Sequence, residues 1–136
     1  MPNVDWRDSF NTGSQSIDRQ HRELFDGITA LETTMAAESF ESANTSCRAL
    51  RELLWAHFAY EEALLREAEF PRLAQHAASH ASGRGKIEHV LTQCRENCRN
   101  GTKVGCVSHW LVALLDDVLL PDLDFKSHID HRNVRD

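Results

Sequence analysis

Apolar residues recur every three or four positions along this chain, and histidines take some positions of the same pattern. This spacing places side chains along one face of an α-helix, and that face must be buried against other elements. The first two stripes are Ile17, His21, Leu24, Ile28, Leu31 and Met35, and then Ala43, Cys47, Leu50, Leu54, His57, Glu61, Leu64 and Ala68. The chain is therefore predicted to form amphipathic helices with several histidines turned into the core.

Two further stripes complete the prediction of the fold. They are Leu73, His76, His80, Ile87, Val90, Leu91 and Cys94, and then Trp110, Leu111, Leu114 and Val118 on a helix from about residue 107. Phe70-Pro71 marks a short connection, and Pro121 is expected to disturb or end the last helix. Four helices with short connections predict an all-α, up-down-up-down four-helix bundle.

The length and charge of the chain limit its class. Its 136 residues fit a single domain over 1–136, with an N-terminal arm over 1–14 and a C-terminal tail over 124–136. The net charge of −6 and the lack of a basic stripe in the sequence argue against a nucleic-acid partner. The sequence has no apolar run long enough for a membrane span, and its polar, acidic start does not resemble a secretory signal. We therefore expect a cytoplasmic protein.

The four cysteines are Cys47, Cys94, Cys98 and Cys106, and all are expected to be free thiols in a reducing compartment. Cys47 lies on an apolar stripe and is predicted to belong to the core. Cys94, Cys98 and Cys106 together with His109 offer an alternative zinc site, although the spacing is irregular. A redox-sensing pair of Cys94 and Cys98 is a further alternative, which depends on exposure.

Two pairs of polar residues lie four positions apart on predicted core faces. His57 and Glu61 form one pair, and His76 and His80 form the other. Residues four apart lie almost above one another on a helix, so each pair directs two ligands at one spot. His21 adds a ligand from a third helix. Because burial of these groups without a metal would leave polar atoms unsatisfied, the stripes predict a metal centre inside the bundle.

The ligand types restrict the metal. Imidazole and carboxylate without thiolate suit iron or manganese better than structural zinc. Ferritin-like di-iron bundles use Glu-x-x-His motifs, which are absent from this sequence. The predicted centre is therefore of a histidine-rich kind.

These motifs resemble those of the bacterial hemerythrins over nearly the whole chain. The resemblance is carried by Trp6, Gly13, Ile17-Asp18-x-Gln20-His21, His57-x3-Glu61-Glu62, Phe70-Pro71 and His76-x3-His80. It implies a four-helix bundle with two non-heme iron ions, held by five histidines, two bridging carboxylates and an oxo or hydroxo bridge. It also implies that dioxygen binds end-on at the iron that has an open position.

The resemblance implies a role for each matching residue. His21 and His57 would hold the oxygen-binding iron. His76 and His80 would hold the other iron, and Glu61 would bridge the two.

The predicted fourth helix departs from the family pattern, which is His-x4-Asp followed three residues later by an aromatic residue. The best register is Asp117-x4-Asp122 with Phe125 as the aromatic residue. Asp122 would then be the second bridging carboxylate, and Asp117 would replace the fifth histidine. A carboxylate at that position stabilises ferric over ferrous iron, so the centre should autoxidise faster than one with five histidines. Alternatively, Asp117 binds through water and the second iron is weakly held.

Other interpretations of this helix stay open. A rival register, anchored on Trp110, places Leu114 and Leu119 at the two positions and loses both ligands. Asp116 is a competitor of Asp117, and the two aspartates are otherwise a solvated pair at a helix end. His109 lies about two helical turns too early to be the missing ligand. His89, His128 and His131 are expected to lie at the surface.

The sequence thus predicts a non-enzymatic di-iron protein that binds dioxygen or a related small ligand, for oxygen or redox sensing or for oxygen carriage. An apolar oxygen pocket would be lined by Leu24, Phe25, Leu54, Phe58, Trp110 and Leu114. By the family resemblance, a signalling output domain or partner such as a diguanylate cyclase is expected. The alternatives are a di-iron oxidase or peroxidase that consumes oxygen or peroxide, and an iron storage or repair protein.

Overall fold

A computed structural model of the chain describes residues 8–37, 40–99, 106–126 and 128, without the side chains of 32–37, 40–43, 97–99, 106–108 and 117. The described elements are all helical. They are a 3-10 helix at Asp8–Phe10, α1 (Gln15–Ala37), α2 (Phe40–Glu67), α3 (Leu73–Arg99), α4 (Cys106–Leu114), a π-helix at Leu115–Leu119, α5 (Leu120–Asp122) and a 3-10 helix at Leu123–Phe125.

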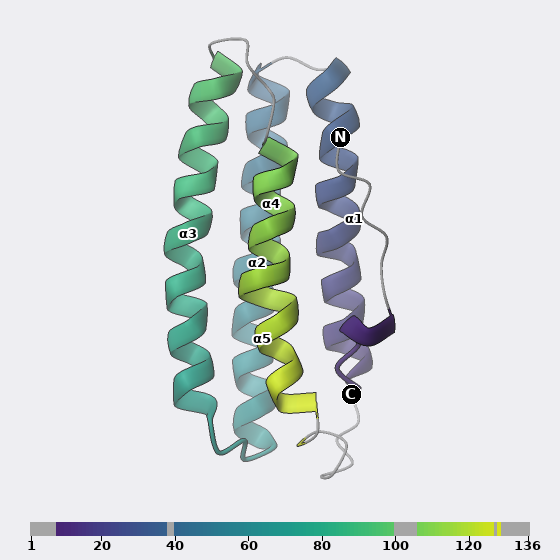
Figure 1. Ribbon diagram of the computed structural model, residues 1–136, viewed down its shortest axis with the longest axis vertical. Coiled ribbons are helices and arrows are strands. Elements are labelled where there is room, and N and C mark those ends of the chain that lie inside the picture. Colours follow the sequence, from purple (N-terminus) through teal and green to yellow (C-terminus); the bar gives the residue numbers. More distant parts are fainter. Residues whose placement is uncertain (1–7, 38–39, 100–105, 127, 129–136) are drawn as a thin grey trace.

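The long helices lie side by side as an antiparallel bundle, in which α4, the π-helix and α5 together form the fourth member (Figure 1). Helix α1 packs against α2 and α4, and α3 packs against the same two helices. The predicted all-α, up-down-up-down bundle is therefore confirmed. None of the helices in the described ranges has the length and apolar character needed to cross a membrane.

The segment before α1 is tied to that helix by two side chains. Oγ of Ser14 accepts a hydrogen bond from the backbone N–H three residues later at 3.2 Å, as an N-cap residue does. The Asp18 carboxylate accepts hydrogen bonds from the backbone N–H and the hydroxyl of Thr12 at 2.7 and 2.9 Å. Gly13 has a φ of 99°, which residues with a Cβ rarely adopt. Gly13 and Asp18 therefore orient the start of α1, while Trp6 lies outside the described residues.

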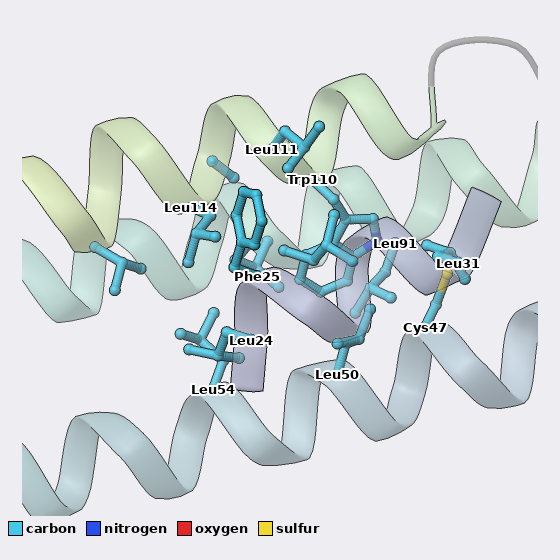
Figure 2. Packing of buried hydrophobic residues seen from close by; sticks show 14 of the residues in the cluster. Leu24, Phe25, Leu31, Cys47, Leu50, Leu54, Leu91, Trp110, Leu111 and Leu114 are labelled. Atoms are coloured by element: carbon cyan, nitrogen blue, oxygen red, sulfur yellow. The ribbon is translucent and has the colours of Figure 1, made fainter. Parts of the chain in front are cut away.

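Two apolar clusters fill the interior, and polar residues separate them along each helix. The larger cluster, shown in Figure 2, includes Leu24, Phe25, Leu31, Cys47, Leu50, Leu54, Leu91, Trp110, Leu111 and Leu114. The smaller cluster contains Ile17, Leu65, Phe70 and Phe125. On α1, His21 lies between Ile17 of the smaller cluster and Leu24 of the larger one. The polar residues are thus shielded from solvent by apolar side chains both above and below them.

Pro121 disturbs the fourth helix without ending it. A proline lacks the backbone donor for the preceding turn, and its ring crowds that turn. Here the preceding turn is the wider π-helix, in which the Leu120 N–H donates to the Leu115 carbonyl. Helical geometry then continues to Phe125, and Asp122 is fully buried. The wider turn therefore accommodates Pro121, so the helix continues and places the Asp122 carboxylate in the core.

Candidate metal centre

Six polar side chains from all four members of the bundle are buried together between the two apolar clusters. The largest exposed fraction among them is 5%. They are His21 on α1, His57 and Glu61 on α2, His76 and His80 on α3, and Asp122 on α5. Because such burial is unfavourable unless the groups are paired or bind a metal, their mutual geometry decides what the cluster can do.

The first group consists of His21, His57 and one oxygen from each of two carboxylates. Nε2 of His21 lies 2.7 Å from Oδ2 of Asp122 and 3.1 Å from Nε2 of His57. Nε2 of His57 lies 3.0 Å from Oε2 of Glu61 and 3.6 Å from Oδ2 of Asp122. Two imidazole nitrogens and two carboxylate oxygens therefore face a common point.

The second group has the same composition and uses the other two carboxylate oxygens. Nε2 of His76 lies 2.5 Å from Oε1 of Glu61 and 3.0 Å from Oδ1 of Asp122. Nε2 of His80 lies 3.0 Å from the same Glu61 oxygen. The ligand atoms within each group all lie within 4.8 Å of one another.

Glu61 and Asp122 connect the two groups, because each directs its two oxygens at different histidine pairs. Oε2 of Glu61 and Oδ1 of Asp122 are buried, and each lies 3.0 Å from an imidazole nitrogen. Neither accepts a well-aligned hydrogen bond from any residue that the structure describes. The first of these oxygens belongs to the group of His21, and the second to the group of His76. A cation in each group would satisfy that oxygen. The residues therefore fit a centre of two metal ions bridged by two carboxylates.

Protons compete with a metal for these groups. Burial disfavours protonated His21, but hydrogen bonds with Asp122 and Glu61 outweigh burial and raise its pKa from 6.5 to about 9. The same balance raises the pKa of His76 to about 10. Burial also opposes the Glu61 anion, yet hydrogen bonds from the four imidazoles lower its pKa well below 4.5. The Glu61 carboxylate therefore stays charged, and a metal must displace protons from His21 and His76.

Two of the histidines are oriented by a side chain outside the cluster. Nδ1 of His57 lies 2.7 Å from Oε1 of Gln20, and Nδ1 of His80 lies 2.9 Å from Oε2 of Glu62. With Nε2 turned towards the cluster, Nδ1 carries the hydrogen and donates it, which fixes the tautomer and the ring orientation. The sequence motifs include Gln20 and Glu62 but give them no role. The available signal is that each immediately flanks a predicted ligand.

A small apolar cavity lies close to the first group. The volume open to the centre of a water-sized molecule is about 10 Å³. The cavity is lined by Leu24, Ile28, Leu54, Ile87, Trp110 and Leu114. Leu24 stands one helical turn after His21. Four of the six residues predicted for an oxygen pocket belong to this lining, whereas Phe25 and Phe58 do not. Phe58 instead stacks on the His80 ring with centroids 4.1 Å apart. A cavity of this size holds one very small molecule.

The structure brings six of the seven predicted ligands together, and the seventh is Asp117. Its backbone belongs to the π-helix, and its side chain lies outside the described residues. The ligand role of Asp117 stays a prediction.

The other candidates on this helix lie away from the cluster. Leu114 and Leu119, which the rival register places at the ligand positions, are buried in the larger apolar cluster. Asp116 is exposed. His89 on α3 is exposed as predicted, and His109 is also exposed. With Asp116, these two histidines line an open groove between α3 and α4.

His128 differs from the prediction of a surface residue. It is half-buried, and its Nε2 lies 2.6 Å from the Ala68 carbonyl oxygen. The imidazole ring also lies edge-on to Phe70 at 5.4 Å. His128 therefore attaches the end of the fourth helix to the turn between α2 and α3, and His131 lies outside the described residues.

The cysteines agree with the prediction only in part. Cys47 is free and buried, as predicted for a core residue. Cys94 is disulfide-bonded, so the expectation of a free thiol is wrong for this residue. The metal-type groups that the described residues form contain neither Cys94 nor His109, and the side chains of Cys98 and Cys106 lie outside the description.

The chain is similar in sequence to known proteins over much of its length. A bacteriohemerythrin from Pseudomonas paraeruginosa is 27% identical over 113 residues, which cover 82% of this chain and 73% of that protein. A hemerythrin from Siphonosoma cumanense is 31% identical over 83 residues, and a bacteriohemerythrin from Clostridium acetobutylicum is 29% identical over 87 residues. Both of these alignments cover 61% of this chain and 67% of the relative.

The family comparison covers most of the chain. The family sequence model of the hemerythrin HHE cation binding domain matches residues 12–131, a range that contains all six clustered residues. With the helical bundle and the buried histidine and carboxylate cluster, this match shows that the chain belongs to the hemerythrin HHE cation binding domain family.

Proposed function

We propose that this chain is a non-enzymatic protein that holds two non-heme iron ions and binds dioxygen or a related small ligand. The observation that carries the proposal is the way Glu61 and Asp122 divide their oxygens between two histidine pairs. Imidazole nitrogen and carboxylate oxygen without thiolate suit iron. The names of the relatives, hemerythrin and bacteriohemerythrin, support the same function.

The proposal assigns one ion to each histidine pair. His21 and His57 would hold the first ion, and His76 and His80 would hold the second. Glu61 and Asp122 would bridge them together with an oxo or hydroxo group, and Asp117 is proposed as a further ligand of the second ion. Bound iron would supply the electrons for oxygen chemistry, which the side chains of this cluster cannot supply.

The surroundings favour ligand binding beside His21 and His57. Leu24 and Leu54 line the apolar cavity, and each stands one helical turn from one of these histidines. An apolar lining excludes water and proton donors, and it thereby protects a small bound ligand from side reactions. The cavity is small enough to select against larger molecules.

The finer role that we propose is oxygen or redox sensing, or oxygen carriage. Asp117 in the sequence favours sensing, because an anionic oxygen ligand stabilises ferric iron and makes storage of oxygen less reversible. A signalling output domain or partner, such as a diguanylate cyclase, fits a sensing role. The cytoplasmic location stays a prediction from the sequence.

Iron-reconstituted protein tests this function. Anaerobic loading with Fe²⁺ should give two iron ions per chain by elemental analysis. Oxygen should then produce a visible absorption change that reverses when oxygen is removed. Continuous oxygen consumption would instead support an oxidase or peroxidase, and iron that a mild chelator removes without any oxygen response would support storage or repair. Zinc alone, or no metal after iron-replete expression, contradicts the proposal.

A further inference from the structure

The two histidine pairs differ in the charge of the side chain that contacts them from outside. Nδ1 of His57 donates to the neutral amide oxygen of Gln20, whereas Nδ1 of His80 donates to the carboxylate of Glu62. Nδ1 of His21 is buried and has no hydrogen-bond partner in the described part of the chain. Among the described residues, a carboxylate from outside the cluster contacts an imidazole of the pair His76 and His80. Among the same residues, no such carboxylate contacts the pair His21 and His57.

Glu62 belongs to a closed ring of contacts with His80, Arg84 and Phe58. An Nη2 atom of Arg84 lies 3.6 Å from Oε2 of Glu62, and its guanidinium carbon lies 5.3 Å from the centre of the Phe58 ring. Phe58 stacks on His80 with an angle of 18° between the planes. Phe58 and Glu62 are four residues apart on α2, as are His80 and Arg84 on α3, so each pair shares one helix face. The ring of contacts fixes both the imidazole and the carboxylate.

The charge of Glu62 acts mainly on His80. The contact with Nδ1 of His80 is 2.9 Å, shorter than the 3.6 Å contact with Arg84. The imidazole is also almost fully buried, with a side chain that is 1% exposed, whereas that of Arg84 is 37% exposed. Solvent screens the more exposed cation more strongly. Arg84 therefore holds Glu62 in place but neutralises it incompletely.

We propose that Glu62 strengthens the metal position of His76 and His80, so that the two positions of the centre differ in metal affinity and in reduction potential. This inference rests on the proposed two-metal centre. A carboxylate that accepts the Nδ1 hydrogen increases the basicity of a metal-binding imidazole and fixes its orientation. A stronger donor favours ferric over ferrous iron, so the position beside Glu62 has the lower potential.

The inequality has a functional consequence for the proposed centre. The position of His76 and His80 is the first to give up an electron. The position of His21 and His57, next to the apolar cavity, keeps the neutral Gln20 contact and remains available for the ligand. Glu62 is thus a positioning residue that adds to the difference between the two positions.

The Glu62→Gln variant tests the inference, because glutamine keeps the size and the acceptor oxygen but removes the charge. The redox-inert ion Zn²⁺ is titrated into metal-free protein by calorimetry. We expect the unchanged protein to bind two ions with unequal affinities. In Glu62→Gln the tighter affinity should fall by about 10–100-fold, the range found for outer partners of metal ligands, while the weaker affinity stays the same.

Gln20→Glu is the matched control, since it brings a carboxylate to the other pair through the same kind of contact. It should tighten the weaker position and reduce the difference between the two. The Arg84→Gln variant distinguishes an effect of the Glu62 charge from a purely structural role of Glu62. If the charge strengthens metal binding, removal of the positive charge of Arg84 should keep or increase the metal affinity of the position of His76 and His80. If Glu62 only holds the ring of contacts together, Arg84→Gln weakens binding as Glu62→Gln does, and the inference is overturned.

Redox titration of protein loaded with ⁵⁷Fe gives an independent readout by Mössbauer spectroscopy, which distinguishes ferrous from ferric ions. Glu62→Gln should raise the potential of the ion that oxidises first. A tenfold larger loss of affinity for ferric than for ferrous iron corresponds to about 59 mV for a one-electron couple. Equal potentials in Glu62→Gln and the unchanged protein would contradict the inference.

The outcomes separate this inference from the proposed function. If the unchanged protein takes up two ions and Glu62→Gln binds them identically, with helix content preserved by circular dichroism, only the role of Glu62 is refuted. Equal weakening of both positions refutes it as well. If the unchanged protein binds no metal, both proposals fail. If two iron ions bind unequally but oxygen has no reversible effect, the role of Glu62 stands and the oxygen-binding function fails.

Discussion

Nε2 of His21 lies 2.7 Å from Oδ2 of Asp122, although 101 positions separate the two residues in the chain. This contact joins the first helix of the bundle to the last. Both side chains are essentially without solvent exposure, so neither can be paired with water instead. The cluster therefore contributes to the closure of the bundle, and its loss should affect both metal binding and stability.

Replacement of Asp122 by asparagine should abolish the binding of at least one metal ion. The change removes the charge that His21 and His76 contact, and it leaves Glu61 as the single bridging carboxylate among the described residues. Breaking a buried ion pair also costs about 3–5 kcal/mol of unfolding free energy. Elemental analysis and urea unfolding measure the two effects. Asp124→Asn is the matched control, because Asp124 is 53% exposed and pairs with Arg72, and it should keep full metal content.

Metal loading should raise the thermal stability of the folded chain. A ligand that binds only the folded state stabilises it by about 2.7 kcal/mol at a free concentration 100 times its Kd. Differential scanning calorimetry with increasing Fe²⁺ under anaerobic conditions should show a rising melting temperature. An excess of chelator should reverse the rise. A melting temperature that does not depend on metal concentration would argue against binding in the core.

Stability of the metal-free protein should fall between about pH 6.5 and pH 10. The pKa values of His21 and His76 are raised above 6.5 to about 9 and about 10 in the folded chain. Their protonation therefore stabilises the fold fully below pH 6.5, and this contribution is lost as the pH rises through the folded values. Each pKa unit corresponds to about 1.36 kcal/mol, so urea unfolding should detect the loss readily. Metal-loaded protein, whose histidines are already deprotonated, serves as the control and should lack this decrease.

The ionised Glu61 carboxylate also stabilises the fold, but this contribution to the unfolding free energy is lost at acid rather than at alkaline pH. Its pKa lies well below 4.5 in the folded chain, because the imidazoles donate hydrogen bonds to its carboxylate and outweigh burial. The resulting stabilisation is present above pH 4.5 and is lost as the pH falls through the lowered value. Glu61→Gln should therefore flatten the acid limb of the stability curve in metal-free protein. An unchanged acid limb would mean that other carboxylates dominate acid unfolding.

Truncation of Leu54 to alanine should enlarge the cavity beside the first group and speed spontaneous oxidation of the iron-loaded protein. The larger space admits water, which promotes loss of the bound ligand. The substitution should also cost about 2–5 kcal/mol of unfolding free energy. Leu31→Ala is a matched control, because Leu31 is equally buried in the larger cluster but does not line the cavity. Equal oxidation rates in the two variants would show that the cavity does not protect the bound ligand.

Replacement of Asp117 by histidine should slow autoxidation, since a neutral imidazole stabilises ferric iron less than a carboxylate does. The expectation comes from the sequence register, with Asp117 five residues before Asp122 on the π-helix segment. Stopped-flow mixing of the reduced protein with oxygen gives the rate. Asp116→His controls for an added imidazole on the exposed neighbouring position. If Asp117→His and the control oxidise at the same rate as the unchanged protein, Asp117 does not ligate iron.

The helices and the inward histidines follow from local properties of the chain. A spacing of three or four residues places side chains on one helix face whatever the partner helix is. His57 and Glu61, and His76 and His80, could therefore be paired from the sequence, and the structure buries all four in one cluster. Local spacing does not determine where each helix begins. Helix α3, for example, begins at Leu73, two residues after Pro71.

The fourth helix shows where local patterns fail. Asp122 is four residues after Val118 and so continues the stripe before Pro121, but local spacing predicts neither the π-helix at Leu115–Leu119 nor a helix that continues past the proline. The sequence suggested Asp122 through a family resemblance and left Leu119 as a rival. Packing decided between them, since Leu119 lies in the apolar cluster while Asp122 lies beside His21.

By itself, the sequence determined that this chain forms amphipathic helices with histidines and a glutamate on their buried faces. These properties depend on residues within a few positions of one another, and helix geometry relates them directly. The tertiary structure alone decided that Glu61 and Asp122 each face both histidine pairs, and that Glu62 contacts His80 while Gln20 contacts His57. These relationships join separate helices, so they depend on the rotation and height of each helix in the packed bundle, which no local spacing specifies.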